Sequence, residues 1–220
     1  QCAEKLPMKV RFFDVAQALS VLVELPGGET ILVDLGESPT RPGCGLVCKE
    51  AHGRLLERLT AVLGERPISL VWITHQHSDH LGGAQGVFQH LRAKYLVDNG
   101  LDGETKQVAR LHEMATNAGA IFRRVNPEKP NLPLTLEGPA RVTPVVPPEW
   151  PASCDKNKNE CSIGLRIDYC QSSVLFTGDA EEDAEASWDV QPATLLQVGH
   201  HGSDTSSTEE FLQKVQPKYA

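Results

Sequence analysis

The densest group of potential metal ligands is a short run of three histidines and one aspartate: His75, His77, Asp79 and His80. The run follows the continuously apolar segment 68–74, for which we predict a strand buried on both faces. If the chain leaves this strand extended and then turns, the two leading histidines point the same way, and the turn brings the other two side chains nearby. Imidazole and carboxylate together suit zinc, and also iron or manganese. The pattern therefore predicts a metal site at a strand end rather than an exposed polar loop.

Two later segments share this arrangement, in which an apolar strand ends in a possible ligand. The first is Thr177-Gly178-Asp179, whose carboxylate is placed to bridge two cations, although Gly and Asp are also ordinary turn residues. The second is the segment 198–203, which contains His200 and His201. Three strand ends that carry ligands converge on one site more easily than three unrelated loops do.

The elements that must position these residues are predicted from the spacing of apolar side chains. Strands are predicted at 9–15, 20–25, 30–35, 68–74, 95–97, 121–125, 162–169, 173–177 and 194–198. Helices are predicted at 50–63, 84–90, 104–118 and 208–215. The segments 38–48 and 127–151 are rich in proline and are predicted to be a loop and a connection.

This order of elements predicts an α/β (α+β) fold, a four-layer αββα sandwich with strands inside and helices outside. We expect residues 1–220 to form a single domain made of two half-domains, roughly 1–126 and 140–220. Residues 217–220 look like the start of a last strand, so we expect the domain to be incomplete at its C-terminal end.

Composition and charge limit the possible functions. The chain has 220 residues, of which 40% are hydrophobic, enough to bury a sizeable core. With 21 Lys and Arg against 29 Asp and Glu, its formal net charge of −8 repels a polyanion unless bound cations or a local basic patch reverse the field. No apolar run approaches the roughly 18 residues that a membrane-spanning helix needs.

The cysteines bear on the compartment. The six are Cys2, Cys44, Cys48, Cys154, Cys161 and Cys170. Two close pairs lie in predicted surface loops, which favours disulfides over free thiols or a thiolate metal site. We therefore favour an exported protein, periplasmic or extracellular, with a cytoplasmic location left open. Because the chain begins with Gln1, we expect that it was processed or trimmed, and Cys2 is not the first residue that a lipoprotein would have.

The order H-x-H-x-D-H, T-G-D and V-G-H-H-G-S resembles the motifs of the metallo-β-lactamase superfamily. Two further features, Asp14-Val15-Ala16-Gln17-Ala18 and the Asn159-x-x-Ser162 step, resemble the hydrolase domain of the ComEC/Rec2 competence proteins. The resemblance covers residues 8–220. It implies a hydrolase that uses a hydroxide activated by two divalent cations, Zn²⁺ in the first place and Mn²⁺ as the alternative.

The resemblance also implies a role for each site residue. His75 and His77 would hold the first cation and Asp79, His80 and His200 the second, with Asp179 bridging the two. We favour His200 over His201 as the ligand because it lies nearer the strand end, so that His201 faces the substrate and acts in catalysis with Asp79. Asp34 would hold the histidine run in position without binding a cation itself. The residues expected to bind substrate are Asn159, Ser162 and Ser203.

Two departures from the family pattern affect these expectations. Ala16 and Ala18 stand where relatives have glycine, so that loop has lost a contact. No histidine lies between His112 and His200, where lactamases and glyoxalases place one. The first cation therefore has one protein ligand fewer, or takes Asn159 or water, and a true β-lactamase is disfavoured.

The favoured function is a phosphodiesterase or nuclease that acts on DNA, although the net charge argues against it. The alternatives are a hydrolase of small esters, lactones or phosphocholine-type groups, a weak β-lactamase-like enzyme and, in another class, a non-catalytic metal-binding module. Lys156 and Lys158 precede the Asn-x-x-Ser step and belong either to a solvated loop or to a contact with substrate phosphate. The sequence gives no indication of the oligomeric state.

Overall fold

The larger of two sheets has six strands in chain order. The computed structural model describes residues 6–220, so Cys2 lies outside the described residues. The strands are β1 (Lys9–Phe12), β2 (Val21–Glu24), β3 (Thr30–Val33), β4 (Ile68–Trp72), β5 (Ala93–Asp98) and β6 (Ile121–Arg124). The first three are antiparallel, joined at β2 and β3 by a turn in which Gly28 has a φ of 91°. The strands from β3 to β6 run parallel, which requires the longer helical connections between them.

The smaller sheet has four strands in the order β10-β9-β8-β7. Their bounds are β7 (Arg141–Val145), β8 (Gly164–Tyr169), β9 (Ser172–Phe176) and β10 (Leu195–Leu196). Strand β7 lies within the segment 127–151, for which the sequence predicted only a connection. It pairs with β8 alone, and such an edge strand tolerates Pro144, the residue that argued against a strand.

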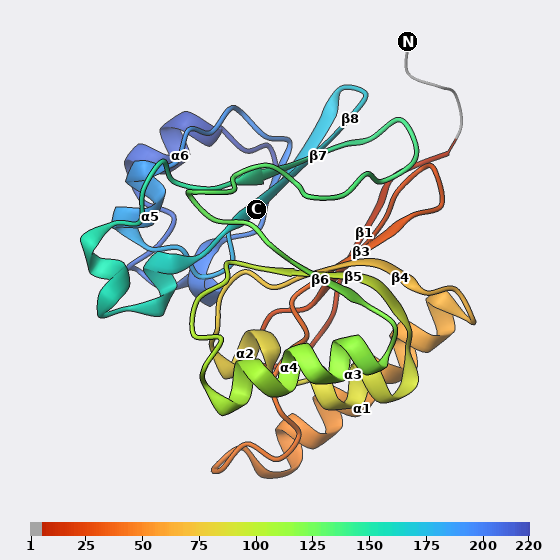
Figure 1. Cartoon of the computed structure of the whole chain (residues 1–220). Helices are drawn as coiled ribbons and strands as arrows, with labels where there is room; N and C mark the ends of the chain where they lie inside the picture. Colours follow the sequence, from red (N-terminus) through yellow and green to blue (C-terminus); the bar gives the residue numbers. More distant parts are fainter. Residues whose placement is uncertain (1–5) are drawn as a thin grey trace.

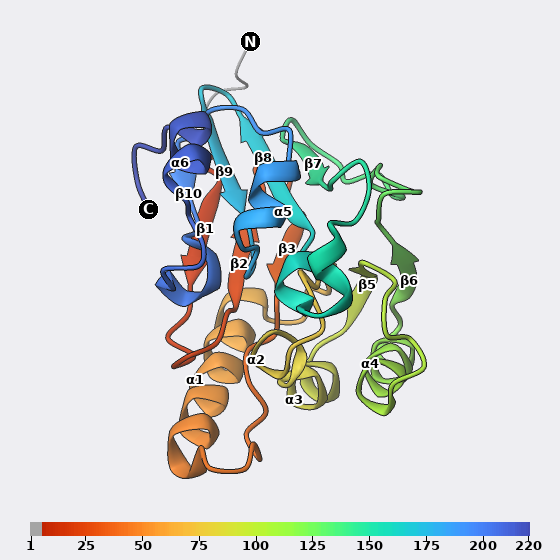
Figure 2. The ribbon, with the colours of Figure 1, turned by 90° about the vertical axis from the view of Figure 1, so that its left-hand side faces the viewer.

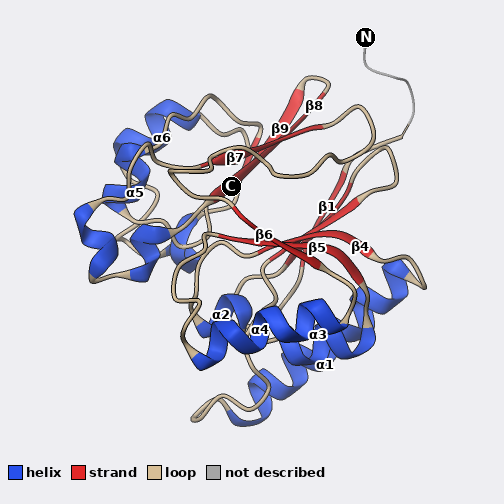
Figure 3. Ribbon diagram, viewed as in Figure 1, coloured by secondary structure: helices blue, strands red, loops and turns tan. Residues whose placement is uncertain are grey.

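Helices cover the outer face of each sheet (Figures 1 and 3). On the larger sheet they are α1 (Gly45–Leu63), α2 (Ser78–Leu81), α3 (Ala84–His90) and α4 (Lys106–Asn117). On the smaller sheet they are α5 (Glu182–Ser187) and α6 (Glu209–Val215), which stand in front of that sheet in Figure 2. Three short 3-10 turns complete the chain: η1 (Ala152–Asp155), η2 (Lys158–Cys161) and η3 (Gly199–Gly202). The predicted four-layer mixed α/β sandwich is confirmed.

The alternation of side chains along the strands creates three apolar layers. In β2, for example, Leu22 packs with the helices of the larger sheet, whereas Val21 and Val23 face the smaller sheet. The layer between the sheets includes Trp72, whose indole nitrogen donates to the carbonyl of Ile163 at 3.2 Å. Strands buried on both faces explain why the sequence shows continuous apolar runs. Their ends lie at one edge of the sandwich, where the polar motifs follow.

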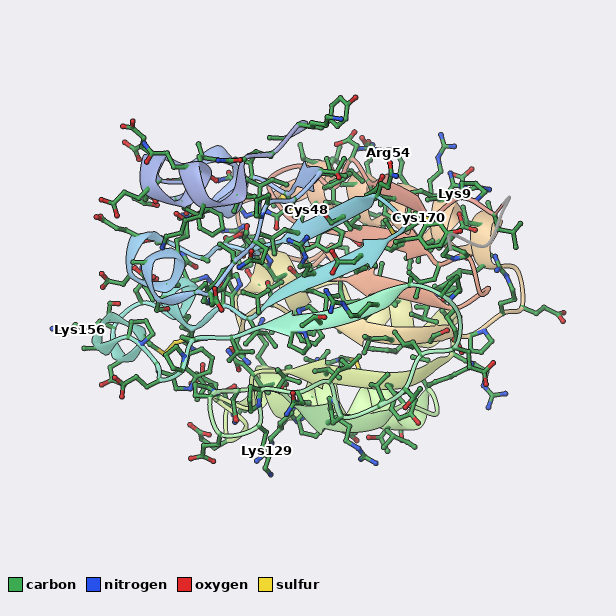
Figure 4. All side chains as sticks on the ribbon, turned by 90° about the horizontal axis from the view of Figure 1, so that it is seen from above. Lys9, Cys48, Arg54, Lys129, Lys156 and Cys170 are labelled. Carbon is green, nitrogen blue, oxygen red and sulfur yellow. A yellow bond between two sulfur atoms is a disulfide. The ribbon has the colours of Figure 1, made fainter. Side chains whose placement is uncertain are left out.

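Two disulfides fit the predicted close pairs, Cys44 with Cys48 and Cys154 with Cys161. The first spans one turn at the start of α1, which begins five residues before the predicted helix, inside the segment expected to be a loop. The second closes the loop that carries Lys156, where its sulfur bond is visible in Figure 4. These pairs are consistent with an exported protein. Among the described residues, no helix has the length and apolar character needed to cross a membrane.

Candidate metal centre

The histidine run forms a tight turn after β4. Thr74 and His75 are fully buried at the strand end, and His77 precedes α2, which contains Asp79 and His80. The carbonyl of His77 accepts hydrogen bonds from the backbone nitrogens of His80 and Leu81, both at 3.1 Å. This turn places His80 in the interior and leaves Asp79 half-buried at the surface.

Asp34 holds this turn in place from the end of β3. Its carboxylate accepts hydrogen bonds from the backbone nitrogen and the hydroxyl of Thr74, both at 2.8 Å, and lies 2.6 Å from Nδ1 of His80. The residue has a φ of 57°, a conformation that aspartate tolerates better than most residues do. Because Nδ1 of His80 is engaged by Asp34, its Nε2 atom is directed to the other side. This is the arrangement by which a carboxylate orients a metal-binding imidazole.

Four side chains bring their ligand atoms within 4.8 Å of one another: Asp79, His80, Asp179 and His201. We call this set the four-residue cluster. Nε2 of His201 lies 3.2 Å from Oδ2 of Asp79 and 3.3 Å from Oδ2 of Asp179. Nε2 of His80 lies 3.1 Å from Oδ1 of Asp179, yet neither of these two buried atoms has a hydrogen-bond partner among the described residues. A proton or a metal cation satisfies such a pair, and two imidazoles with two carboxylates suit a divalent cation.

The charges in the cluster are strongly coupled. Burial opposes a charge on His80, but the charge of Asp34 and the contacts with Asp179 and Asp34 outweigh it and raise the pKa of His80 to about 10. Contacts with Asp179 and Asp79 raise the pKa of His201 to about 9, against the effect of burial. Burial raises the pKa of Asp179, but the neighbouring His201 and His80 hold it well below its ordinary value. The carboxylates thus favour positive charge at this position.

His75 and His77 lie beside the four-residue cluster but outside it. The ring of His75 is 4.2 Å from the ring of His80, between centroids, and its Nε2 atom lies 3.0 Å from Nδ1 of His77. Burial lowers the pKa of both His75 and His77. Both imidazoles are therefore held in the neutral form, which is the form that binds a metal.

The two adjacent histidines of η3 point in different directions. His201 joins the four-residue cluster, whereas Nδ1 of His200 lies 3.1 Å from Oε1 of Glu181 and its Nε2 atom is 4.0 Å from Oδ2 of Asp179. The sequence-based choice of His200 assumed that the strand continues up to that residue. Instead, both residues have positive φ, 47° and 53°, so the chain turns sharply and directs the second side chain inward. The geometry therefore favours His201 over His200 as a ligand.

Glu181 is a residue of the site that the sequence did not indicate. Its carboxylate accepts hydrogen bonds from the amides of Asn159 at 2.7 Å and Asn157 at 3.0 Å, and it contacts His200. Its position two residues after Asp179 was the available signal, since alternate residues can share a face. The structure thus brings Asn159 to the site through Glu181 and His200.

The side chains of the other two residues expected to bind substrate, Ser162 and Ser203, make no hydrogen bond to the four-residue cluster within residues 6–220. The hydroxyl of Ser162 is buried and lacks a hydrogen-bond partner there. The hydroxyl of Ser203 lies 3.0 Å from that of Thr205. Thr205 in turn lies 3.2 Å from Nδ1 of His200, so Ser203 reaches the site only indirectly.

A buried amide network connects the histidine turn to the 3-10 turn η2. Gln76 donates a hydrogen bond to the side chain of Asn99, which in turn donates to the carbonyl of Cys161 at 2.8 Å. Cys161 belongs to the disulfide that closes the loop carrying Asn159. The network therefore fixes the histidine turn relative to the loop on the opposite side of the site. The sequence did not predict it, because a lone Gln and a lone Asn have no distinctive spacing.

Comparisons with known proteins show the family of the chain. Residues 13–220 match the family model of the metallo-beta-lactamase superfamily. The chain is 32% identical over 171 residues to ComE operon protein 3 of Bacillus subtilis, covering 76% of this chain and 21% of that protein. It is 26% identical over 218 residues to Recombination protein 2 of Haemophilus influenzae, covering 96% of this chain and 24% of that protein. The chain therefore spans less than a quarter of the length of these relatives.

Solved structures show the same fold. The metallo-beta-lactamase fold protein YhfI from Bacillus subtilis aligns with a TM-score of 0.53 and 18% identity, covering 86% of this chain and 70% of that one. A further relative is Competence protein ComA of Neisseria gonorrhoeae, 27% identical over 225 residues, covering 96% of this chain and 26% of that protein. Together with the family match and these relatives, the shared fold confirms the resemblance predicted from the motifs. The chain belongs to the metallo-beta-lactamase superfamily.

Proposed function

We propose that the chain is a metal-dependent phosphodiesterase that cleaves DNA, with a divalent cation held by the four-residue cluster. The observation that carries the proposal is the pair of buried, unpartnered atoms in this cluster, Nε2 of His80 and Oδ1 of Asp179. Zn²⁺ is the first candidate for this mixture of imidazole and carboxylate, and Mn²⁺ is the second. The neutral His75 and His77 are the proposed ligands of a second cation beside it.

The chain's own residues then have distinct tasks. Cations held by the four-residue cluster and by His75 and His77 would supply the Lewis acidity that makes water a nucleophile at neutral pH. The side chain of Asp79 is 21% exposed, against 2% for Asp179, so Asp79 is the carboxylate that reaches solvent and can accept the proton of an attacking water. His200 is 30% exposed and contacts Glu181, which places it to donate a proton to the leaving group. In this proposal His200 and His201 exchange the roles expected from the sequence.

The substrate class is proposed from two sources. The relatives are named for competence and recombination, and both names point to DNA. A phosphodiester also suits this site for a chemical reason. Beside the proposed cations lie the hydrogen-bond donors Asn159 and His200, and these donors can contact phosphate oxygens. The second candidate is a small ester or lactone. Such a substrate is not a polyanion, so the net charge of −8 does not repel it.

Metal removal tests the proposed function. We expect the protein to hydrolyse bis(p-nitrophenyl) phosphate and single-stranded DNA, to lose both activities after chelation, and to regain them with Zn²⁺ or Mn²⁺. Metal content by elemental analysis accompanies each assay. Turnover that survives complete chelation contradicts the metal-dependent mechanism. Bound metal with hydrolysis of carboxylic esters alone supports the second candidate, and bound metal with no turnover of any ester indicates a non-catalytic metal-binding module.

A matched pair of variants tests the assignment of the adjacent histidines. We expect His201→Ala to lower the affinity for the cation by more than the roughly 10–100-fold that changes around a metal site cost. We expect His200→Ala to retain the metal and to lower kcat by about 10²–10⁴-fold, the usual contribution of a proton donor. Metal titration and steady-state kinetics measure the two effects. Loss of metal in His200→Ala with normal binding in His201→Ala contradicts the assignment.

A further inference from the structure

Two adjoining grooves lie at the end of β1, and the first of them includes His201 of the four-residue cluster. The first, of about 540 Å³, is lined by Leu19, Val198 and His201, and the second, of about 510 Å³, by Arg54 and Arg58. Phe12 and Phe13 line both grooves, so the two grooves meet at the end of β1. We call the two grooves together the path, with His201 of the cluster in the first and the arginines of α1 in the second.

The shared phenylalanines present an aromatic surface. Phe12 lies on the edge strand of the larger sheet with 49% of its surface exposed, and its ring centroid is 6.4 Å from that of Phe176. Phe13 is partly buried against the apolar layer beneath α1. Aromatic rings exposed next to cationic side chains are the usual platform on which unpaired bases stack.

The charge of the second groove is opposite to that of the whole chain. Arg54 and Arg58 are four residues apart on the exposed face of α1, and Arg54 is labelled in Figure 4. Arg58 has no ion pair with any residue in 6–220, and the contact of Arg54 with Asp14 at 3.2 Å joins two exposed side chains. Such an exposed pair has little strength, so Arg54 is available to another anion. The groove is thus a local basic patch on a protein of net charge −8.

Arginine side chains can pair with phosphates, and phenylalanine rings can stack on bases. A surface that combines the two is suited to a nucleic acid. A duplex hides its base faces, and a small ester does not reach from His201 to the arginines. We propose that the path lined by Phe12, Phe13, Arg54 and Arg58 binds the single-stranded nucleic acid that flanks the scissile phosphodiester. This inference rests on the proposed function and adds to it the substrate form, a single strand, and the direction in which that strand leaves the metal centre.

Direct binding tests the inference without relying on turnover. The probe is a fluorescent single strand of about twelve nucleotides, within the usual site sizes, with phosphorothioate linkages that resist hydrolysis. We expect Arg54→Glu with Arg58→Glu to weaken binding by at least about tenfold and to flatten the slope of log affinity against log salt by about 1.4, for two phosphate contacts. We expect Phe12→Ala to weaken binding about fivefold through lost stacking. Phe12→Ala leaves α1 and its charge unchanged. It therefore still tests the inference if the double arginine variant does not fold.

The matched control is Lys106→Glu with Arg110→Glu, which has the same spacing and charge change on α4, beyond α3 from α1. We expect this control to bind within about twofold of the unmodified chain. Equal losses in the groove and control variants, or tighter binding of a duplex or of an anionic vesicle, overturn the inference. If the chain hydrolyses bis(p-nitrophenyl) phosphate but the groove variants bind the strand normally, the inference fails and the proposed function stands. If the groove binds the strand but the chain cleaves no phosphodiester, the proposed function fails.

Discussion

Replacing Asp179 with asparagine is expected to abolish metal-dependent hydrolysis, lowering kcat/KM by at least about 10³-fold. Asp179 lies between the two histidines of the four-residue cluster, 3.1 Å from His80 and 3.3 Å from His201. Against the effect of burial, its pKa is held well below the ordinary value by the neighbouring His201 and His80, which favours the charged carboxylate. The amide of asparagine has the same shape but no charge, and it can turn an NH₂ group towards the histidines. Elemental analysis and kinetics should show the joint loss of metal and activity.

The control for this experiment is Asp183→Asn. Asp183 lies four residues away on the exposed first turn of α5 and undergoes the same chemical change. We expect it to retain both metal and turnover, because only a weak interaction with the end of a short helix is lost. If Asp179→Asn also retains both, the four-residue cluster is not the metal site and the proposed function is wrong.

Asp34→Ala is expected to have the largest effect on stability, lowering the free energy of unfolding by about 3–5 kcal/mol, as the loss of one partner from a buried charged pair does. Asp34 is fully buried and accepts from two groups of Thr74 while contacting His80. Alanine leaves these groups without a partner and also disfavours the φ of 57° at this position. Chemical denaturation of the metal-free chain measures the loss.

Asp34→Asn separates the support of the metal centre from general stability. Asparagine tolerates the same backbone conformation and keeps a carbonyl oxygen for the backbone nitrogen of Thr74. It no longer provides a charge for Nδ1 of His80, so we expect metal affinity to fall by about 10–100-fold in a folded protein. Metal titration monitored beside circular dichroism tests this. Unchanged affinity in Asp34→Asn would mean that Asp34 stabilises the fold without orienting His80.

The layers of the fold were predictable because burial leaves a simple pattern in the sequence. Helix α3 occupies the predicted segment 84–90, and β4 lies within the apolar run 68–74. Strand β7 was missed because its residues alternate weakly and include Pro144, and its pairing with β8 depends on a contact far along the chain. The short helix α5 was missed for a related reason, since six residues carry too little periodicity. The division into half-domains at residues 126 and 140 stays a prediction.

The site was predictable as a set of motifs but not as a set of contacts. The order of motifs indicated which strand ends meet, and the structure does bring Asp79, His80 and Asp179 together. That His201 rather than His200 lies in the four-residue cluster depends on two consecutive residues in the left-handed region, which no pattern of side chains predicts. Glu181 and the bond from Gln76 to Asn99 connect segments that are remote in sequence, so only the folded chain shows them.

The contact between Asp79 and His201 joins residues 122 positions apart, and each comes from a different half of the sandwich. Closing so long a loop is entropically costly, so we expect this contact to form only once the two sheets have docked. A cation held there recognises only the native chain and, at a hundred times its Kd, stabilises it by about 2.7 kcal/mol. A cation bound by the four-residue cluster would therefore also hold the two sheets together, and the rate at which a protease digests the chain would report the occupancy of that site.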